Sequence, residues 1–376
     1  MKLDEHYELF RASCLRFAKE KIAPFVEEWE EAELFPRELY REAAAAGVLA
    51  AAYPEEYGGS GGDMLHGLIG VEALLTGGSS GVVAGLGSLG IALPPILALG
   101  SEEQKQRFIA PVLRGEKVAA LAITEPGTGS DVAGIATRAV RDGTDYVLNG
   151  SKMFITSGAR ADLVSVLART GPDKHGGLTF FVIEKGMPGF SVSRALKKTG
   201  WRASDTAELS FDGVRVPEAN RIGDEGSGFV ALMKNFQHER LALAFYGHAT
   251  AAIALEDALA YARERSAFGR PLVGFQVTRH KLARMATEVE AARTLNYSCA
   301  LRVRDGDYLV KEVSMAKNFS AEVAQRVCYE AVQIFGGMGF MRETRVERLS
   351  RDARLLPIGG GTTEIMNEII AKGLGL

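Results

Sequence analysis

A run of three glycines near the end of the chain is the first stretch that could come close to a ligand. It lies in Pro357–Glu364, which reads P-I-G-G-G-T-T-E. Glycine has no Cβ, so the backbone can bend sharply there and its N–H groups can approach a bound molecule. A plain connector between two helices has a similar composition. The stretch alone therefore predicts a close-approach loop, which we call the late loop, without naming its ligand.

A second stretch, Leu121–Asp131, predicts a strand that runs into a turn rich in glycine and serine. Its sequence, L-A-I-T-E-P-G-T-G-S-D, offers the hydroxyls of Thr124 and Ser130. Hydroxyls and exposed backbone N–H groups suit a phosphate or a polarisable ring. The dinucleotide pattern G-x-G-x-x-G fails because Val132 stands at its last glycine, and no G-K-[ST] follows. The stretch is therefore a β-loop with donors, and neither a Rossmann fingerprint nor a P-loop.

The composition limits the classes of function. Of the 376 residues, 47% are hydrophobic and 24% charged, and the formal net charge is -3. This balance is typical of a soluble enzyme and does not favour nucleic acid or an anionic membrane as a partner. The three cysteines have neither metal nor C-x-x-C spacing and the six histidines are scattered, so we expect no metal site and a cytoplasmic protein. The N-terminus lacks a secretory signal, and the apolar run Gly81–Leu99 is broken by Gly and Pro, which favours a buried helix over a membrane span.

Hydrophobic periodicity divides the chain into three parts and predicts an α+β multidomain protein. Residues 1–116 have helical spacing. Residues 117–224 alternate with period two and contain Asp142-Gly143, Asn149-Gly150 and Asp212-Gly213, which are typical of hairpin turns in an antiparallel β-domain. Residues 225–376 return to helical spacing and predict a four-helix-type bundle. Its second helix should bury Leu282, Met285, Ala286, Val289 and Ala292. Strands and helices do not alternate, so a parallel Rossmann sheet is excluded.

Six motifs, in this order along nearly the whole chain, resemble the acyl-CoA dehydrogenase family. They are Leu121–Asp131, Asn149–Gly158 (N-G-S-K-M-F-I-T-S-G), Lys198–Thr206 (K-T-G-W-R-A-S-D-T), Arg265–Gln276 (R-S-A-F-G-R-P-L-V-G-F-Q), Gln333–Phe340 (Q-I-F-G-G-M-G-F) and the late loop. The resemblance implies FAD bound between the β-domain and the C-terminal helices, and a homotetramer arranged as a dimer of dimers. It also implies an acyl-CoA substrate and an electron-transfer flavoprotein as the acceptor.

The resemblance further implies which residues hold FAD. Those against the flavin ring would be Thr124, Ser130, Phe154 and Thr156, with Phe154 where many relatives have Trp. Arg265 and Phe268 look like contacts to the pyrophosphate and adenosine half, with Gln276 nearby. Gln333, Gly336 and Gly337 would reach the cofactor of a neighbouring subunit, and Thr362 and Glu364 match positions that touch the flavin. For Phe268 and Phe340, packing at a helix end is the alternative.

The family's reaction removes an α-proton from an acyl thioester while a hydride leaves the β-carbon for flavin N5. It requires a carboxylate base whose pKa is raised by burial. Medium- and short-chain relatives carry that Glu in the late loop, where this chain has Gly360. Isovaleryl- and long-chain-type relatives carry it before an Arg on the first C-terminal helix, and Glu239-Arg240 matches that position. We expect Glu239, among apolar neighbours such as Phe236 and Leu243, to be the base, and the Gly360 N–H to donate to the thioester oxygen. A solvated Glu239 is the alternative.

Substrate contacts are implied for a small set of residues. They are Ser130, Ser204, Gln237, His238 and Arg240. The predicted activity is FAD-dependent dehydrogenation of an acyl-CoA to the trans-2-enoyl-CoA, with pocket depth set by side chains in Leu89–Leu99 and Phe245–Ala251. Two alternatives stay open. One is the same chemistry on a carrier-protein-bound thioester, and the other is a catalytically silent flavin-binding homologue.

Overall fold

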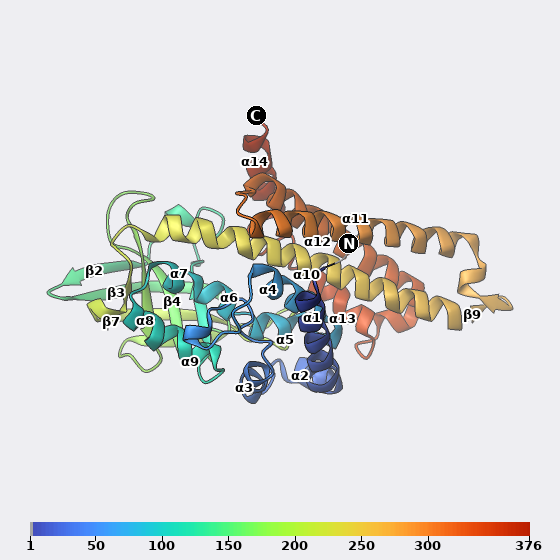
Figure 1. Cartoon of the computed structure of the whole chain (residues 1–376), viewed down its shortest axis with the longest axis horizontal. Coiled ribbons are helices and arrows are strands. Elements are labelled where there is room, and N and C mark those ends of the chain that lie inside the picture. Colours follow the sequence, from blue (N-terminus) through green and yellow to red (C-terminus); the bar gives the residue numbers. More distant parts are fainter. Residues whose placement is uncertain (1–2) are drawn as a thin grey trace.

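The structure is a computed structural model that describes residues 3–376. The first part of the chain is a cluster of short helices, shown in blue and cyan in Figure 1. They are α1 (Glu5–Phe17), α2 (Val26–Ala32), α3 (Glu38–Ala45), α4 (Met64–Leu74), α5 (Ser80–Leu86), α6 (Leu89–Ala92), α7 (Pro94–Leu99), α8 (Glu102–Gln104) and α9 (Ala110–Leu113).

The apolar run Gly81–Leu99 falls in α5, α6 and α7 and does not form one helix. Pro94 and Pro95 occupy the first turn of α7, where a missing N–H costs nothing. Most side chains of α5 are buried in the protein. Within residues 3–376 no single helix is long and apolar enough to cross a membrane, and only the pair α5 and Leu89–Leu99, bent by 44°, satisfies the criteria of length and composition.

The middle part is an eight-stranded sheet. Its strands are β1 (Ala119–Ala122), β2 (Arg138–Asp142), β3 (Asp145–Thr156), β4 (Leu163–Arg169), β5 (Leu178–Glu184), β6 (Phe190–Ala195), β7 (Thr206–Val216) and β8 (Arg221–Ile222). The order is β6-β7-β3-β2-β4-β5-β8, with β1 also beside β4. Most neighbouring strands are antiparallel, as predicted. However, β1 runs parallel to β4, and so does β2 at its first residue, Arg138. Turn dipeptides report only on consecutive strands, so the sequence could not show these two parallel pairs.

Only one of the three predicted hairpin turns forms. Asp142-Gly143 joins β2 to β3, with Gly143 at φ +64°. The prediction for Asn149-Gly150 is wrong, because these residues lie inside β3, where a Cβ on Gly150 would lie 2.5 Å from Thr137 Oγ1. Asp212-Gly213 lies inside β7, where the pairing with β3 shifts register. Gly150 therefore allows a close approach to Thr137, and Gly213 lies at a bulge, both within long strands.

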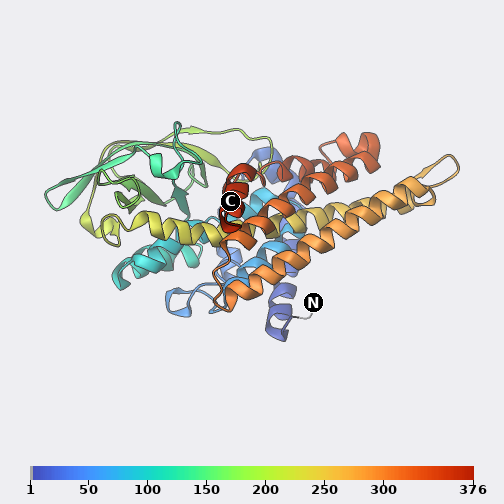
Figure 2. The same ribbon diagram turned by 90° about the horizontal axis from the view of Figure 1, so that it is seen from above.

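The last part is helical and is organised around one long helix. Its elements are α10 (Gly228–Glu264), β9 (Ser266–Ala267), β10 (Arg270–Pro271), α11 (Gln276–Arg304), α12 (Val310–Phe335), α13 (Arg345–Ala353) and α14 (Thr363–Gly373). Helix α10 extends from the sheet to the opposite end of the molecule, where β9 and β10 turn the chain back into α11 (Figures 1 and 2). It packs against both α11 and α12. The predicted buried stripe of α11 is confirmed except at Ala286, which is exposed.

The three parts meet at a buried group of charges. Glu30 of α2 accepts hydrogen bonds from Ser79 Oγ at 2.7 Å and from the Ala203 N–H at 3.3 Å. Asp352 of α13 accepts from the Trp201 N–H at 2.6 Å and from the Ser80 N–H at 3.3 Å. These carboxylates satisfy backbone donors of α5 and of the Lys198–Thr206 motif. They therefore fix that motif against both helical parts.

Candidate active site

Glu239 lies in the fourth turn of α10. Burial raises the pKa of its carboxyl from 4.5 to about 7, although the charges of Arg240 and Lys317 act in the opposite direction. No hydrogen bond from residues 3–376 is among the causes of this pKa. Leu243, one turn further along α10, is buried. The carboxyl is therefore a desolvated group whose pKa lies near neutrality, which is the property that a general base needs.

The late loop lies directly against this carboxyl. Gly360 has φ +64°, and a Cβ placed on it would lie 3.7 Å from Glu239 Oε1. The same Cβ would lie only 2.5 Å from Leu243 Cδ1, so the neighbouring leucine occupies the space of a side chain at position 360. The Gly360 N–H donates to no acceptor within the described residues. The structure thus brings a raised-pKa carboxyl beside a free backbone donor.

Side chains of the next helix turn complete this end of the loop. Thr362 is the N-cap of α14, and its Oγ1 accepts from the Ile365 N–H at 3.4 Å. Glu364 is exposed, and its pKa is lowered first by its own backbone N–H and then by the Thr362 hydroxyl. Both predicted flavin contacts therefore lie in the first turn of α14, close to Gly360.

The predicted flavin residues of the sheet lie at the ends of β1 and β3. The Met153 N–H donates to the Thr124 carbonyl at 2.8 Å, which places Phe154 close to Thr124. The pairing of β3 with β7 shifts register between Lys152 and Ile155, and Phe154 adopts φ +61° with 64% of its surface exposed. A bulky residue at positive φ is rarely found without a local cause, and here it turns an aromatic ring outward beside Thr156. An exposed ring beside two threonines fits a planar polar cofactor.

Sequence reasoning missed the ion pair behind these residues. Lys152 is fully buried and donates to Glu125 Oε1 at 2.9 Å and to the Ile123 carbonyl at 2.8 Å. Glu125 also accepts from the N–H groups of Ala136 (2.7 Å) and Thr137 (2.9 Å). Burial acts to raise the pKa of Glu125, but Lys152 and these donors lower it overall. The pair anchors the loop that carries Thr124, and the only sequence signal was that each residue stands inside one of the six motifs.

The predicted substrate residues differ from one another in burial and in their hydrogen-bond partners. Ser204 is buried and its hydroxyl donates to the Trp201 carbonyl at 2.9 Å, so it is part of a structural turn. Gln237 is buried and its Nε2 has no partner within the described residues, whereas His238 is exposed. Arg240 donates through Nε to the Gly360 carbonyl at 3.2 Å. Ser130 is exposed on the loop that follows β1.

The remaining predicted cofactor residues lie at the other end of the molecule. Arg265 ends α10, and Phe268, in the turn between β9 and β10, is 96% exposed. Gln276 begins α11. The segment with Gln333, Gly336 and Gly337 ends α12, and it joins the same end because Phe335 stacks on Tyr261 with ring centroids 4.1 Å apart. This end of the molecule lies opposite the part that holds the sheet (Figures 1 and 2).

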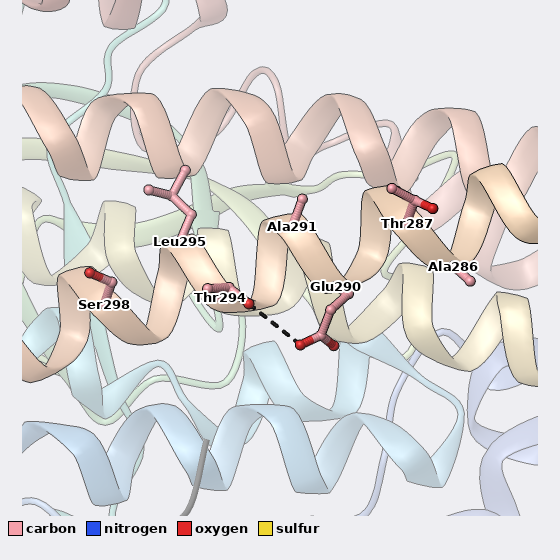
Figure 3. Close-up of a pocket in the computed structure, with 7 residues that line it drawn as sticks. All are labelled: Ala286, Thr287, Glu290, Ala291, Thr294, Leu295 and Ser298. Carbon is pink, nitrogen blue, oxygen red and sulfur yellow. Dashed lines mark hydrogen bonds between the residues drawn. The ribbon is translucent and has the colours of Figure 1, made fainter.

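One open hollow of the described structure does not belong to this site. It is an open groove of about 820 Å³ along the outer side of α11 (Figure 3). The residues that line it are Ala286, Thr287, Glu290, Ala291, Thr294, Leu295 and Ser298. Its one internal polar contact is the 3.4 Å hydrogen bond between Thr294 and Glu290. Residues 3–376 hold no group of three His, Cys, Asp or Glu side chains that could bind a metal ion.

Family models and known proteins match the whole of this architecture. The N-terminal, middle and C-terminal domain models of acyl-CoA dehydrogenase match residues 4–116, 120–214 and 226–375. An acyl-CoA dehydrogenase of Bacillus subtilis (strain 168) is 39% identical over 376 residues, covering 100% of this chain and 99% of the relative. The long-chain specific mitochondrial enzyme of Rattus norvegicus is 39% identical over 370 residues, with 97% and 86% covered.

Solved structures agree with these matches. A probable acyl-CoA dehydrogenase of Mycobacterium abscessus has a TM-score of 0.98 at 51% identity, covering 99% of each chain. The prolyl acyl carrier protein oxidase AnaB has a TM-score of 0.94 at 32% identity, covering 100% of each chain. A glutaryl-CoA dehydrogenase of Mycobacterium smegmatis in complex with FADH2 has a TM-score of 0.93 at 30% identity, covering 99% of this chain and 95% of that one. The chain therefore belongs to the acyl-CoA dehydrogenase family, whose members are FAD-dependent oxidoreductases that act on the CH–CH bond of an acyl-CoA.

Proposed function

We propose that Glu239 is the base that removes the α-proton of the acyl thioester in this enzyme. The observation that carries the proposal is the contact between Glu239 and the late loop, where a carboxyl with a pKa of about 7 faces a glycine with a free N–H. As the α-proton leaves, negative charge develops on the thioester oxygen, and a preorganised N–H donor stabilises it. Gly360 supplies that donor, and the enolate-like charge is held between the loop and α10. This arrangement corresponds to the isovaleryl- and long-chain type of the family.

FAD, when bound, accepts the hydride from the β-carbon and so completes the trans-2-enoyl product. Among the residues of this chain, Thr124, Phe154 and Thr156 would hold the ring side, and Thr362 and Glu364 would lie near the late loop. The exposed Phe154 beside two hydroxyls fits this assignment. Ser130, Ser204, Gln237 and His238 stay predicted contacts of cofactor or substrate.

A second copy of the chain would complete the cofactor site. Arg265, Phe268 and Gln276 lie at the end of the molecule where β9 and β10 turn the chain back, opposite the end that holds the sheet, and Phe268 is almost fully exposed. We propose that the turn between β9 and β10 and the Gln333–Gly337 segment of one subunit reach the cofactor of another. A homotetramer meets this requirement, and its electrons would pass to an electron-transfer flavoprotein. A cytoplasmic location stays a prediction.

The proposal is tested by anaerobic bleaching of the flavin absorbance. The FAD-loaded wild-type protein is mixed with acyl-CoAs from short to long and branched, and at least one should reduce the flavin. Glu239→Gln should bind FAD and acyl-CoA yet fail to bleach. Undiminished bleaching by the variant would show that the base assignment is wrong.

The same assay separates the alternatives. A protein that bleaches with plain acyl-CoA acts on free CoA thioesters. A protein that bleaches only with an acyl group on the phosphopantetheine arm of a carrier protein would share the substrate class named for AnaB. No bleaching with either class would indicate a silent flavin-binding homologue.

A further inference from the structure

The backbone of the late loop is held from behind by three side chains. Each donates a hydrogen bond to a different carbonyl of the loop: Arg240 Nε to Gly360 at 3.2 Å, Lys317 Nζ to Gly361 at 2.6 Å, and Asn318 Nδ2 to Thr363 at 3.2 Å. Two of the donors are consecutive residues of α12, a helix far from the loop in sequence. The Thr363 N–H closes the loop by donating to the Pro357 carbonyl at 3.1 Å.

Lys317 is the unusual member of this set. Lys317 is only 1% exposed, and it forms no ion pair with a carboxylate among the described residues. Lysine is almost never fully buried unless it is paired. The charged groups that act on Lys317 are Arg240, Glu239 and Glu364, and its direct partner is the neutral Gly361 carbonyl. A buried cation that holds a glycine carbonyl next to the proposed base requires a reason beyond core packing.

Three glycines in succession would otherwise leave the loop conformationally free. Glycine loses more backbone freedom on ordering than any other residue, and the three glycines offer no side chains that could anchor the loop. Fixing the carbonyls of Gly360 and Gly361 fixes the two peptide planes that follow Gly360. At φ +64° this also limits the direction of the Gly360 N–H, which has no acceptor within the described residues.

We propose that Lys317 is a positioning residue for the reaction. Through the Gly361 carbonyl it locks the late loop so that the Gly360 N–H is presented to the thioester oxygen, and it places a positive charge near Glu239. Asn318 and Arg240 hold the neighbouring carbonyls in the same way. The inference rests on the proposed function, because it assumes that the Gly360 N–H serves the substrate.

The test compares Lys317→Met with Lys317→Arg, which keeps a donor and the charge. Lys311→Met is the control, because Lys311 lies on the same helix, is partly exposed and pairs only with its neighbour Glu312 at 3.4 Å. Hydrogen–deuterium exchange of the peptide that spans residues 357–363, measured without substrate, should be at least about 10-fold faster in Lys317→Met. The control should exchange like the wild type, and Lys317→Arg should lie between the two.

The kinetic readout uses the FAD-loaded enzyme. For Lys317→Met we expect the rate of flavin reduction to fall about 10-fold or more while KM for acyl-CoA changes less than about threefold, because the contact strengthens in the transition state. Exchange and rate both equal to wild type would overturn the inference. So would a rise of KM that accounts for the whole loss. If Lys317→Met does not accumulate as folded protein, Lys317→Gln, which loses the charge but retains an amide donor, is measured instead. A smaller acceleration of exchange and a smaller loss of rate are then expected, and values equal to wild type would overturn the inference.

The proposed function and the positioning role of Lys317 are contradicted by different results. If the wild-type enzyme is not reduced by any acyl thioester, the proposed function is wrong. If the wild type is reduced and Lys317→Met behaves like Lys311→Met in both exchange and rate, only the positioning role is wrong.

Discussion

Two desolvated carboxylates near the active site, Glu125 and Glu239, differ in what surrounds them. Glu125 receives three hydrogen bonds to its oxygens, from Lys152 and two backbone N–H groups, and its pKa is lowered. Glu239 lies near Arg240 and Lys317, but both cations donate to loop carbonyls instead of to its carboxyl, and its pKa is raised to about 7. Desolvation acts to raise the pKa of both carboxyls, so the direct donors decide the outcome. Glu125 therefore holds the loop in place, whereas Glu239 can take a proton.

The strongest test of this contrast neutralises each of the two carboxylates in turn. Glu239→Gln should reduce the rate of flavin reduction by roughly 10²–10⁴-fold, the usual worth of a positioned general base, with FAD content unchanged. Glu125→Gln in FAD-loaded protein should keep the rate within about 10-fold of wild type, because it removes no group that moves a proton. Stopped-flow absorbance measures both. Equal losses in the two variants would remove the distinction.

Removing Glu125 should instead reduce stability. Glu125→Ala leaves Lys152 buried without its partner, which typically costs about 3–5 kcal/mol. Chemical unfolding of the variant should show this loss, while the exposed pair Arg114–Glu116 offers a control, since Glu116→Gln should leave the transition unchanged. The double variant Glu125→Leu with Lys152→Met should recover most of the loss. An unchanged transition for Glu125→Ala would show that the pair is not an anchor.

Glu239→Gln should have the opposite effect on stability, and only at higher pH. Glu239 has a pKa of about 7 in the folded protein against 4.5 for the free group, so the folded state holds a proton that the unfolded chain has released. Stability therefore falls as pH rises from 4.5 to 7, by up to roughly 3 kcal/mol. The variant removes this penalty, so its thermal midpoint should exceed that of wild type at pH 8 and match it near pH 4.5. A gain of the same size at both pH values would contradict the raised pKa.

A smaller effect concerns moving the base to the late loop. In the Glu239→Gln background, Gly360→Glu should stay inactive, because Leu243 Cδ1 lies 2.5 Å from the new Cβ and φ +64° disfavours a side chain. Adding Leu243→Ala should raise the rate of flavin reduction by about 10-fold over the double variant by opening that space. Recovery without the leucine change would show that Leu243 does not block the position.

The comparison also shows what the sequence could reveal. The three-part architecture followed from hydrophobic period, and the pairing of Glu239 with Gly360 followed from two motifs that complement one another. Glu125 and Lys152 stood inside recognised motifs, yet their contact depends on how β1 and β3 meet, which no local pattern reports. The same is true of Lys317, whose partner lies on a loop 44 positions away. Asn149-Gly150 has the local signature of a turn, but its contact with Thr137 places it inside a strand.

The central claim is that Glu239 moves the α-proton, and exchange of that proton tests it most directly. An acyl-CoA with sulfur in place of the β-carbon has no β-hydrogen to lose, so only the proton step can occur. In D2O the FAD-loaded wild type should carry deuterium into the α-position, with a rate that rises with pH through a midpoint near 7 as the carboxylate forms. Glu239→Gln should show only the background rate of the buffer. Exchange by the variant at the wild-type rate would contradict the account.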